Sequence, residues 1–150
     1  MNRRAGIWAK RGRVMLFSCV ILLMAPLCRA EYIAVITHPD NPLSEISRKQ
    51  LSNLYLGRNK AIENNRFLEL YDHPDNSAIR EDFFERLNGM SLSRVNAYWA
   101  RLRFTGRIFP PTSLLGDDEV IEAVKHNKQA LSYVDGESVT ADVKVILWLK

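Results

Sequence analysis

The stretch Tyr32–Thr37, which reads YIAVIT, decides the fold because it is a continuous apolar run of strand length. A half-buried strand alternates apolar and polar residues, whereas a strand covered on both faces is apolar throughout. The run therefore predicts a central strand in a sheet that has helices on both sides. Two prolines and an asparagine shortly afterwards, at residues 39–42, end the strand.

Downstream of this strand, helix-like and strand-like segments alternate. Further strands are expected over residues 66–71, 131–134 and 143–149, and helices are expected to begin at Ser47, Ser77, Ser91 and Asp117. A serine hydroxyl can cap the start of a helix, and Gly57 and Gly89 can end two of the helices in a left-handed conformation. Alternation of this kind indicates an α/β fold, a three-layer sandwich with a largely parallel sheet.

The first thirty residues have the layout of a secretory signal peptide. Basic residues in the first half are followed by the apolar run Val14–Leu27 and by Cys28-Arg29-Ala30, which fits a signal peptidase site. The run of 14 residues is shorter than the roughly 20 that a permanent membrane helix needs. We therefore expect cleavage after Ala30 and a single exported, periplasmic domain over residues 31–150. An uncleaved anchor is the alternative.

Cleavage at this position changes the charge and the cysteine content of the protein. Six of the 21 Lys and Arg residues lie in residues 1–30, which leaves 15 basic residues against 17 acidic ones, a net charge of −2. The basic surface typical of a nucleic-acid-binding domain is therefore not expected, nor is a nucleic-acid partner. Both cysteines, Cys19 and Cys28, are also removed, which excludes a disulfide, a zinc–cysteine site and a thiol nucleophile.

The most informative stretch for function is Tyr71–Arg80, which reads YDHPDNSAIR. Here a predicted strand runs into a short polar loop and then directly into the helix that begins at Ser77. The start of a helix presents unpaired backbone N–H groups, and a hydroxyl adds another donor, so the arrangement favours an oxyanion. Ligands of open α/β sheets also bind beyond the carboxyl ends of strands. The alternative is that Ser77 merely caps its own helix.

Four short motifs, taken in order, resemble the periplasmic phosphate-binding proteins of ABC importers. The motifs are Ile33–Ile36, Leu54–Gly57, residues 75–83 and Leu131–Asp135. Full-length members of that family have two lobes that close on the anion, and this chain has room for one. The resemblance implies a short, single-lobe relative in the type II periplasmic binding protein-like superfamily. It also implies phosphate or a similar small oxyanion as ligand, and an ABC permease or another inner-membrane protein as partner.

The resemblance also indicates which residues hold the anion. The family's phosphate loop reads arginine, two residues, glycine, serine, glycine, threonine. The five specified positions are occupied here, in order, by His73, Asn76, Ser77, Ala78 and Ile79. Arg80 follows them as a further candidate. Because a titrating histidine replaces a permanently charged arginine fork, and the threonine hydroxyl is lost, we expect binding of about millimolar affinity or weaker.

Catalytic and metal-binding chemistry is not indicated elsewhere in the chain. The three histidines, His38, His73 and His126, lie in separate segments without the spacing of metal ligands. Ser77 has neither a triad at recognisable spacing nor a nucleophile-elbow motif around it. We therefore expect a binding protein that has no cofactor and no enzymatic activity.

A second possible function comes from arginines near the end of the third predicted helix. Arg101, Arg103 and Arg107 lie close in sequence to Trp99 and Phe104. The group is either a solvated helix end or a basic docking face. The second reading leads to an alternative function, a periplasmic protein-interaction or sensory module that has lost ligand transport.

Overall fold

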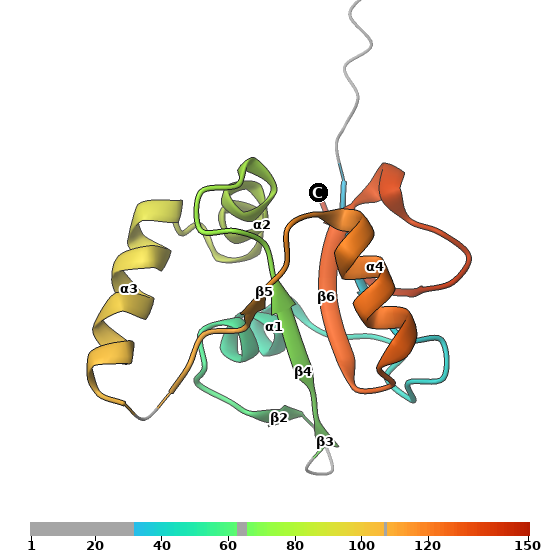
Figure 1. The fold of residues 1–150 in the computed structure, drawn as a ribbon, viewed down its shortest axis with the longest axis horizontal. Helices are drawn as coiled ribbons and strands as arrows, with labels where there is room; N and C mark the ends of the chain where they lie inside the picture. The colour runs from blue at the N-terminus through green and yellow to red at the C-terminus, as the bar shows by residue number, and fades with distance from the viewer. Residues whose placement is uncertain (1–31, 63–65, 107) are drawn as a thin grey trace, which may run out of the picture.

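The computed structural model describes residues 32–62, 66–106 and 108–150. The signal peptide predicted for residues 1–30 lies outside this part of the chain. The described residues form a five-stranded sheet between two helical layers, with α1, α2 and α3 on one side and α4 on the other (Figure 1). The expected α/β sandwich of three layers is confirmed.

The helices are α1 (Arg48–Tyr55), α2 (Ala78–Asn88), α3 (Leu92–Phe104) and α4 (Asp117–His126). The main sheet has the strand order β5-β4-β6-β1-β7. Its strands are β1 (Ile33–Thr37), β4 (Glu69–Asp72), β5 (Thr112–Ser113), β6 (Ala130–Asp135) and β7 (Lys144–Leu149). A separate two-stranded ribbon pairs β2 (Ala61–Ile62) with β3 (Arg66–Phe67), and a 3₁₀ turn, Gly136–Ser138, follows β6.

Four of the five strands in the main sheet point the same way. β4 runs parallel to β5 and to β6, whereas β1 runs antiparallel to both of its neighbours, β6 and β7. The expectation of a largely parallel sheet is therefore confirmed, with β1 as the reversed strand. An apolar run carries no information about strand direction, so the sequence could not reveal this reversal.

The central strand β1 separates two hydrophobic cores. All five of its residues are buried. Ile33 and Val35 pack into the core beneath α1, α2 and α3, whereas Ala34 and Ile36 pack into the smaller core beneath α4. Successive side chains of a strand point to opposite faces, so one short apolar run contributes to both layers. This is the reason for its unbroken apolar character.

The predicted helix starts are correct in position, but only one of the capping hydrogen bonds forms. Ser47 and Gln50 form a reciprocal capping box at α1, with N···O distances of 3.0 and 3.2 Å. Ser77 and Ser91 occupy the N-cap positions of α2 and α3, yet neither hydroxyl makes a capping hydrogen bond. The cap expected at Ser91 is therefore wrong, and so is the alternative in which Ser77 merely caps its own helix.

The strand predicted over residues 66–71 is divided in the structure. Residues 66–67 form β3 and pair with β2, whereas the main-sheet strand β4 begins at Glu69. The neighbouring strands β2 and β5, two residues each, are too short to leave a periodic pattern in the sequence. β4 nevertheless ends at Asp72, directly before the polar loop that the sequence analysis singled out.

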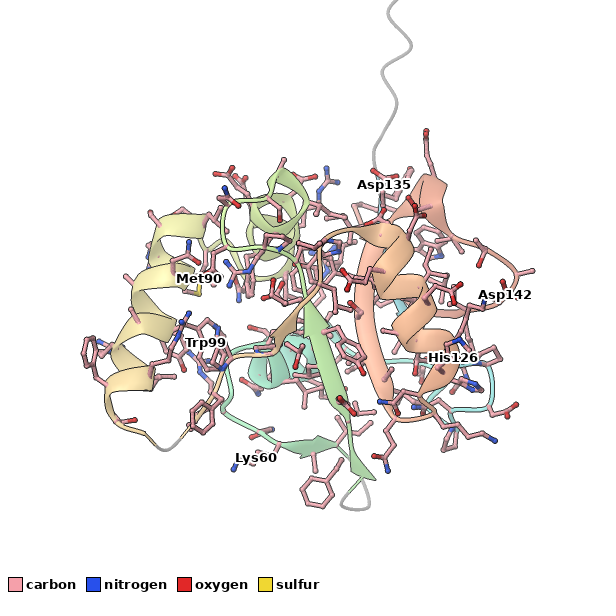
Figure 2. The ribbon with its side chains drawn as sticks, in the orientation of Figure 1. Lys60, Met90, Trp99, His126, Asp135 and Asp142 are labelled. Carbon is pink, nitrogen blue, oxygen red and sulfur yellow. The ribbon has the colours of Figure 1, made fainter. Side chains whose placement is uncertain are left out.

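Gly57 permits a close contact between the end of α1 and the chain around α3, which carries Trp99 (Figure 2). Its φ of +64° is in the left-handed region, as expected for a residue that ends a helix. A Cβ atom added here would lie 2.8 Å from Ile108 Cγ2 and 3.0 Å from Trp99 Cη2. Gly89, which ends α2 with a φ of +70°, has no atom within 4 Å of such a Cβ.

We predict that Gly57→Ala lowers the free energy of unfolding by about 2–5 kcal/mol. The left-handed backbone costs an alanine about 1–2 kcal/mol, and forcing Ile108 and Trp99 apart adds about 1–3 kcal/mol. Gly89→Ala is the matched control, because it carries the backbone cost without the clash, and we expect a loss of about 1–2 kcal/mol. Urea unfolding followed by circular dichroism measures both values. Equal losses in the two variants would contradict the role of the close contact.

Candidate functional site

The start of α2 carries a hydroxyl and backbone donors that the domain does not use internally. Ser77 Oγ is covered by neighbouring atoms and has no hydrogen-bond partner among the described residues. The Ser77 N–H donates to Pro74 O at 2.9 Å, but no hydrogen bond of the described chain uses the N–H of Ala78 or Ile79. Ser77 therefore does not cap its own helix, and the N–H groups of Ala78 and Ile79 have no internal partner among the described residues.

The surface beside these donors is acidic. A pocket of about 540 Å³ is lined by Ala78 and Ile79 together with one arginine, Arg86, and four carboxylate side chains: Glu81, Asp82, Glu85 and Asp135. The positive end of a helix dipole is equivalent to about half a unit charge. Several nearby carboxylates outweigh that field, so the pocket repels a multiply charged anion and lowers the affinity of the site.

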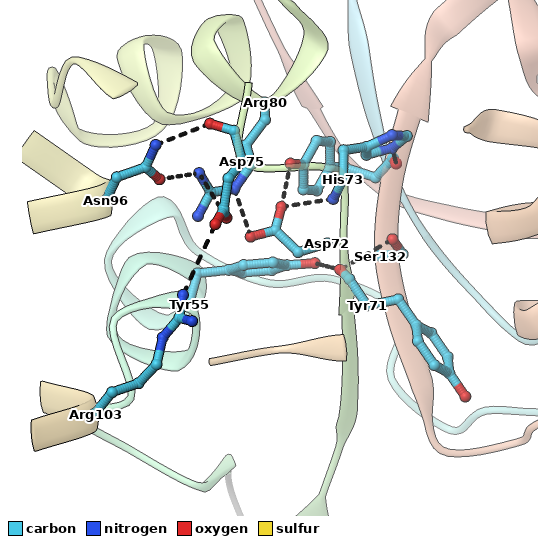
Figure 3. A network of polar contacts seen from close by, with 10 residues as sticks. Tyr55, Tyr71, Asp72, His73, Asp75, Arg80, Asn96, Arg103 and Ser132 are labelled. Carbon is cyan, nitrogen blue, oxygen red and sulfur yellow. Dashed lines mark hydrogen bonds and ion pairs between the residues drawn. The ribbon is translucent and has the colours of Figure 1, made fainter. Parts of the chain in front are cut away.

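Below the loop lies a buried polar network centred on Asp72 (Figure 3). The Asp72 carboxylate, at the end of β4, accepts hydrogen bonds from the His73 N–H at 2.8 Å, from Arg80 Nε at 2.9 Å and from the Tyr133 hydroxyl. Burial, followed by the charge of Asp72, raises the pKa of Tyr133 well above its usual value. The phenol therefore stays protonated and acts as a donor to Asp72.

Arg80 belongs to this network. It is 2% exposed, and its guanidinium also contacts Asn96 Oδ1 at 2.6 Å and Asp75 Oδ1 at 3.6 Å. The Phe84 ring lies 5.2 Å from the centre of the guanidinium. Asp72 therefore compensates the charge of Arg80, and the side chain ties β4, α2 and α3 together.

His73 is also buried, at 2% exposed. Its Nε2 lies 3.0 Å from Tyr133 O and 3.6 Å from Asp117 Oδ1. Because a carbonyl oxygen only accepts, the 3.0 Å contact requires the proton on Nε2. The imidazole thus contacts β6 and the first residue of α4.

The six residues proposed for the anion site fall into two groups. Asn76, Ser77, Ala78 and Ile79 lie together at the start of α2, where the first and third of these are exposed and the other two are half-buried. His73 and Arg80 are held in the buried network instead. Asp72, Asn96 and Tyr133 could not be identified as partners from the sequence. Pairings such as that of Tyr133 with Asp72, 61 residues apart, leave no local pattern.

The described residues show no sign of a metal site or a membrane span. Within the described ranges, no three His, Cys, Asp or Glu side chains gather closely enough to hold a metal ion. No helix in that same part of the chain has the length and hydropathy to cross a bilayer.

Comparison with known proteins gives a likeness of fold only. No protein-family model matches the chain, and no curated protein matches it. Among solved structures, the fold is similar to an ABC-type phosphate transport receptor from Vibrio cholerae, with a TM-score of 0.61 and 19% identity. It is also similar to PstS from Borrelia burgdorferi, with a TM-score of 0.59 and 12% identity. At the level of fold, the resemblance to phosphate-binding proteins is confirmed.

The likeness covers one part of these larger proteins. The matches include 77% of this chain but only 45% of the Vibrio cholerae chain and 46% of the Borrelia burgdorferi chain. The chain therefore spans less than half the length of its structural neighbours. The described domain has the architecture of one lobe of such a binding protein.

We predict that Asp72→Asn lowers the free energy of unfolding by about 3–5 kcal/mol, because it removes the buried counter-charge of Arg80 and leaves only the exposed Asp75 carboxylate at 3.6 Å. Asp82→Asn is the matched control. Asp82 pairs with Arg86 on the partly exposed face of the same helix at 2.8 Å, and we expect a loss below about 1 kcal/mol. Urea unfolding measures both variants. A loss for Asp72→Asn as small as that of the control would show that the network does not hold the fold together.

Proposed function

We propose that this domain is an exported, solute-binding-like protein that holds phosphate or a similar small oxyanion weakly at the start of α2. The observation that carries the proposal is Ser77 Oγ, a covered hydroxyl that has no hydrogen-bond partner in the part of the chain that the structure describes. A buried donor left unsatisfied costs about 1–3 kcal/mol, so folded proteins rarely keep one without a reason. An incoming anion would accept from the N–H groups of Ala78 and Ile79, and from this hydroxyl once the Ser77 side chain rotates toward the anion.

The fold supports the same function. The structural neighbours named above are a phosphate transport receptor and PstS, and this chain shares the architecture of part of each. Asn76 and Ser77 lie just beyond the carboxyl end of β4, where ligands of open α/β sheets bind. We extend this to a binding role without enzymatic activity, in the periplasm after cleavage at Ala30, with an ABC permease or another inner-membrane protein as partner.

The expected affinity is low for three physical reasons. The two side chains that would add positive charge, His73 and Arg80, are engaged in the buried network. The adjoining pocket is lined mainly by carboxylates. A single lobe also leaves one side of the anion in water, where each electrostatic contact is weaker than in an enclosed cleft.

One observation favours the alternative function, a protein-interaction or sensory module. Phe104 is 93% exposed at the end of α3, where Arg101 and Arg103 are also exposed. Arg107, the third arginine of the group, lies outside the described residues. An aromatic ring flanked by arginines is a common composition at protein interfaces. A partner recovered from envelope extracts by the wild type and by Ser77→Ala, but not by Phe104→Ser, would favour this function over solute binding.

We predict that inorganic phosphate or sulfate binds residues 31–150 with a dissociation constant of about 1 mM, and that Ser77→Ala weakens binding at least about tenfold. A hydrogen bond to a charged group contributes about 1.5–3 kcal/mol, and each 1.4 kcal/mol is a factor of ten. Isothermal titration calorimetry measures the constant. At 10 mM anion the wild type should gain about 1.4 kcal/mol of stability.

The matched control is Ser91→Ala. Ser91 occupies the N-cap of α3 and, like Ser77, makes no capping hydrogen bond. We expect this variant to bind phosphate as the wild type does. Absence of both binding heat and thermal stabilisation at about 10 mM anion would reject the proposed site.

A further inference from the structure

A second pocket lies at the carboxyl ends of β4 and β5, on the α3 side of the loop. It has a volume of about 310 Å³. Asp72 and Ser113, the last residues of the two strands, line it together with His73, Asp75, Arg80 and Arg103. Ser77 does not line this pocket, and neither do the α2 carboxylates that line the acidic pocket described above. Its hydrogen-bond donors include Arg80 from α2, Arg103 from α3 and Ser113 from β5.

Two guanidinium groups meet at this pocket. Arg80 approaches from α2 and is almost fully buried, and no hydrogen bond among the described residues uses its Nη2. Arg103 approaches from α3 and is 54% exposed. Arginine forks are well suited to carboxylate and phosphate groups because their donors lie in one plane. The Ser113 hydroxyl, on the exposed edge of the sheet, is an additional donor.

The Asp75 carboxylate lies between these two arginines (Figure 3). Its Oδ1 is 3.6 Å from Arg80 Nη1, and its Oδ2 is 3.8 Å from Arg103 Nη2. Both distances exceed that of a hydrogen bond, and the Asp75 side chain is 65% exposed. Ion pairs of this kind contribute little to stability. Asp75 therefore bridges both cations in the way a bound carboxylate would, but it is held loosely.

We propose that this pocket is an anion site whose internal occupant is the Asp75 carboxylate, and that a small oxyanion or carboxylate from solution binds there by displacing it. The formal charges of the four ionic side chains, Asp72, Asp75, Arg80 and Arg103, add to zero. Asp72 continues to compensate Arg80 when Asp75 moves away, so displacement leaves one net positive charge for the ligand. Asp75 thus acts as a built-in competitor that keeps affinity low.

The test is a set of phosphate titrations on Asp75→Asn, which keeps the shape of the side chain and removes its charge. We expect phosphate to bind Asp75→Asn at least tenfold more tightly than the wild type. Adding Arg103→Gln should abolish this gain, because it removes the exposed cation of the pocket. Adding Arg101→Gln is the matched control: Arg101 lies on the same helix and does not line this pocket, and the gain should remain.

Combining Asp75→Asn with Ser77→Ala distinguishes this inference from the proposed function. If the tighter phosphate binding of Asp75→Asn persists with Ser77→Ala and disappears with Arg103→Gln, the anion binds in the pocket between the two arginines. A gain lost with Ser77→Ala and kept with Arg103→Gln belongs to the start of α2 and overturns the inference, while leaving the proposed function intact. The inference is also overturned if a folded Asp75→Asn variant binds phosphate no more tightly than the wild type. In that case, the comparison of the wild type with Ser77→Ala still tests the proposed function by itself.

Discussion

The buried pairing of Asp72 with Arg80 is the interaction on which the candidate site depends. It fixes the end of β4 against α2, and the Tyr133 hydroxyl and Asn96 extend it to β6 and α3. The loop between Asp72 and Arg80 is therefore anchored at both ends, and the start of α2 is held in place. The same pairing compensates the charge of Arg80 and keeps this cation away from the start of α2.

Much of the fold could be predicted from the sequence because it depends on local patterns. The unbroken apolar run of β1 indicated a strand covered on both faces. Three serines and an aspartate, Ser47, Ser77, Ser91 and Asp117, indicated where the four helices begin. The reversal of β1 and the ribbon of β2 and β3 could not be predicted, because strand pairing between distant segments has no period in the sequence.

The site was predictable in outline and not in detail. A serine after a polar loop correctly indicated the start of a helix, whereas the absence of a capping bond at Ser77 depends on the rotamer of its side chain. The burial of His73 depends on its contact with the backbone of Tyr133, sixty residues away in the chain. Side chains that resemble ligands in a sequence motif, such as His73, can therefore be buried and stabilise the fold instead.

The position of β1 between β6 and β7 affects how the chain acquires its structure. Both neighbours of β1 come from residues 130–149, so the first strand has no partner in the main sheet until about a hundred further residues have been made. Contacts of such large sequence separation slow folding. A polypeptide with this topology therefore cannot complete the centre of its main sheet until its last strands have been synthesised.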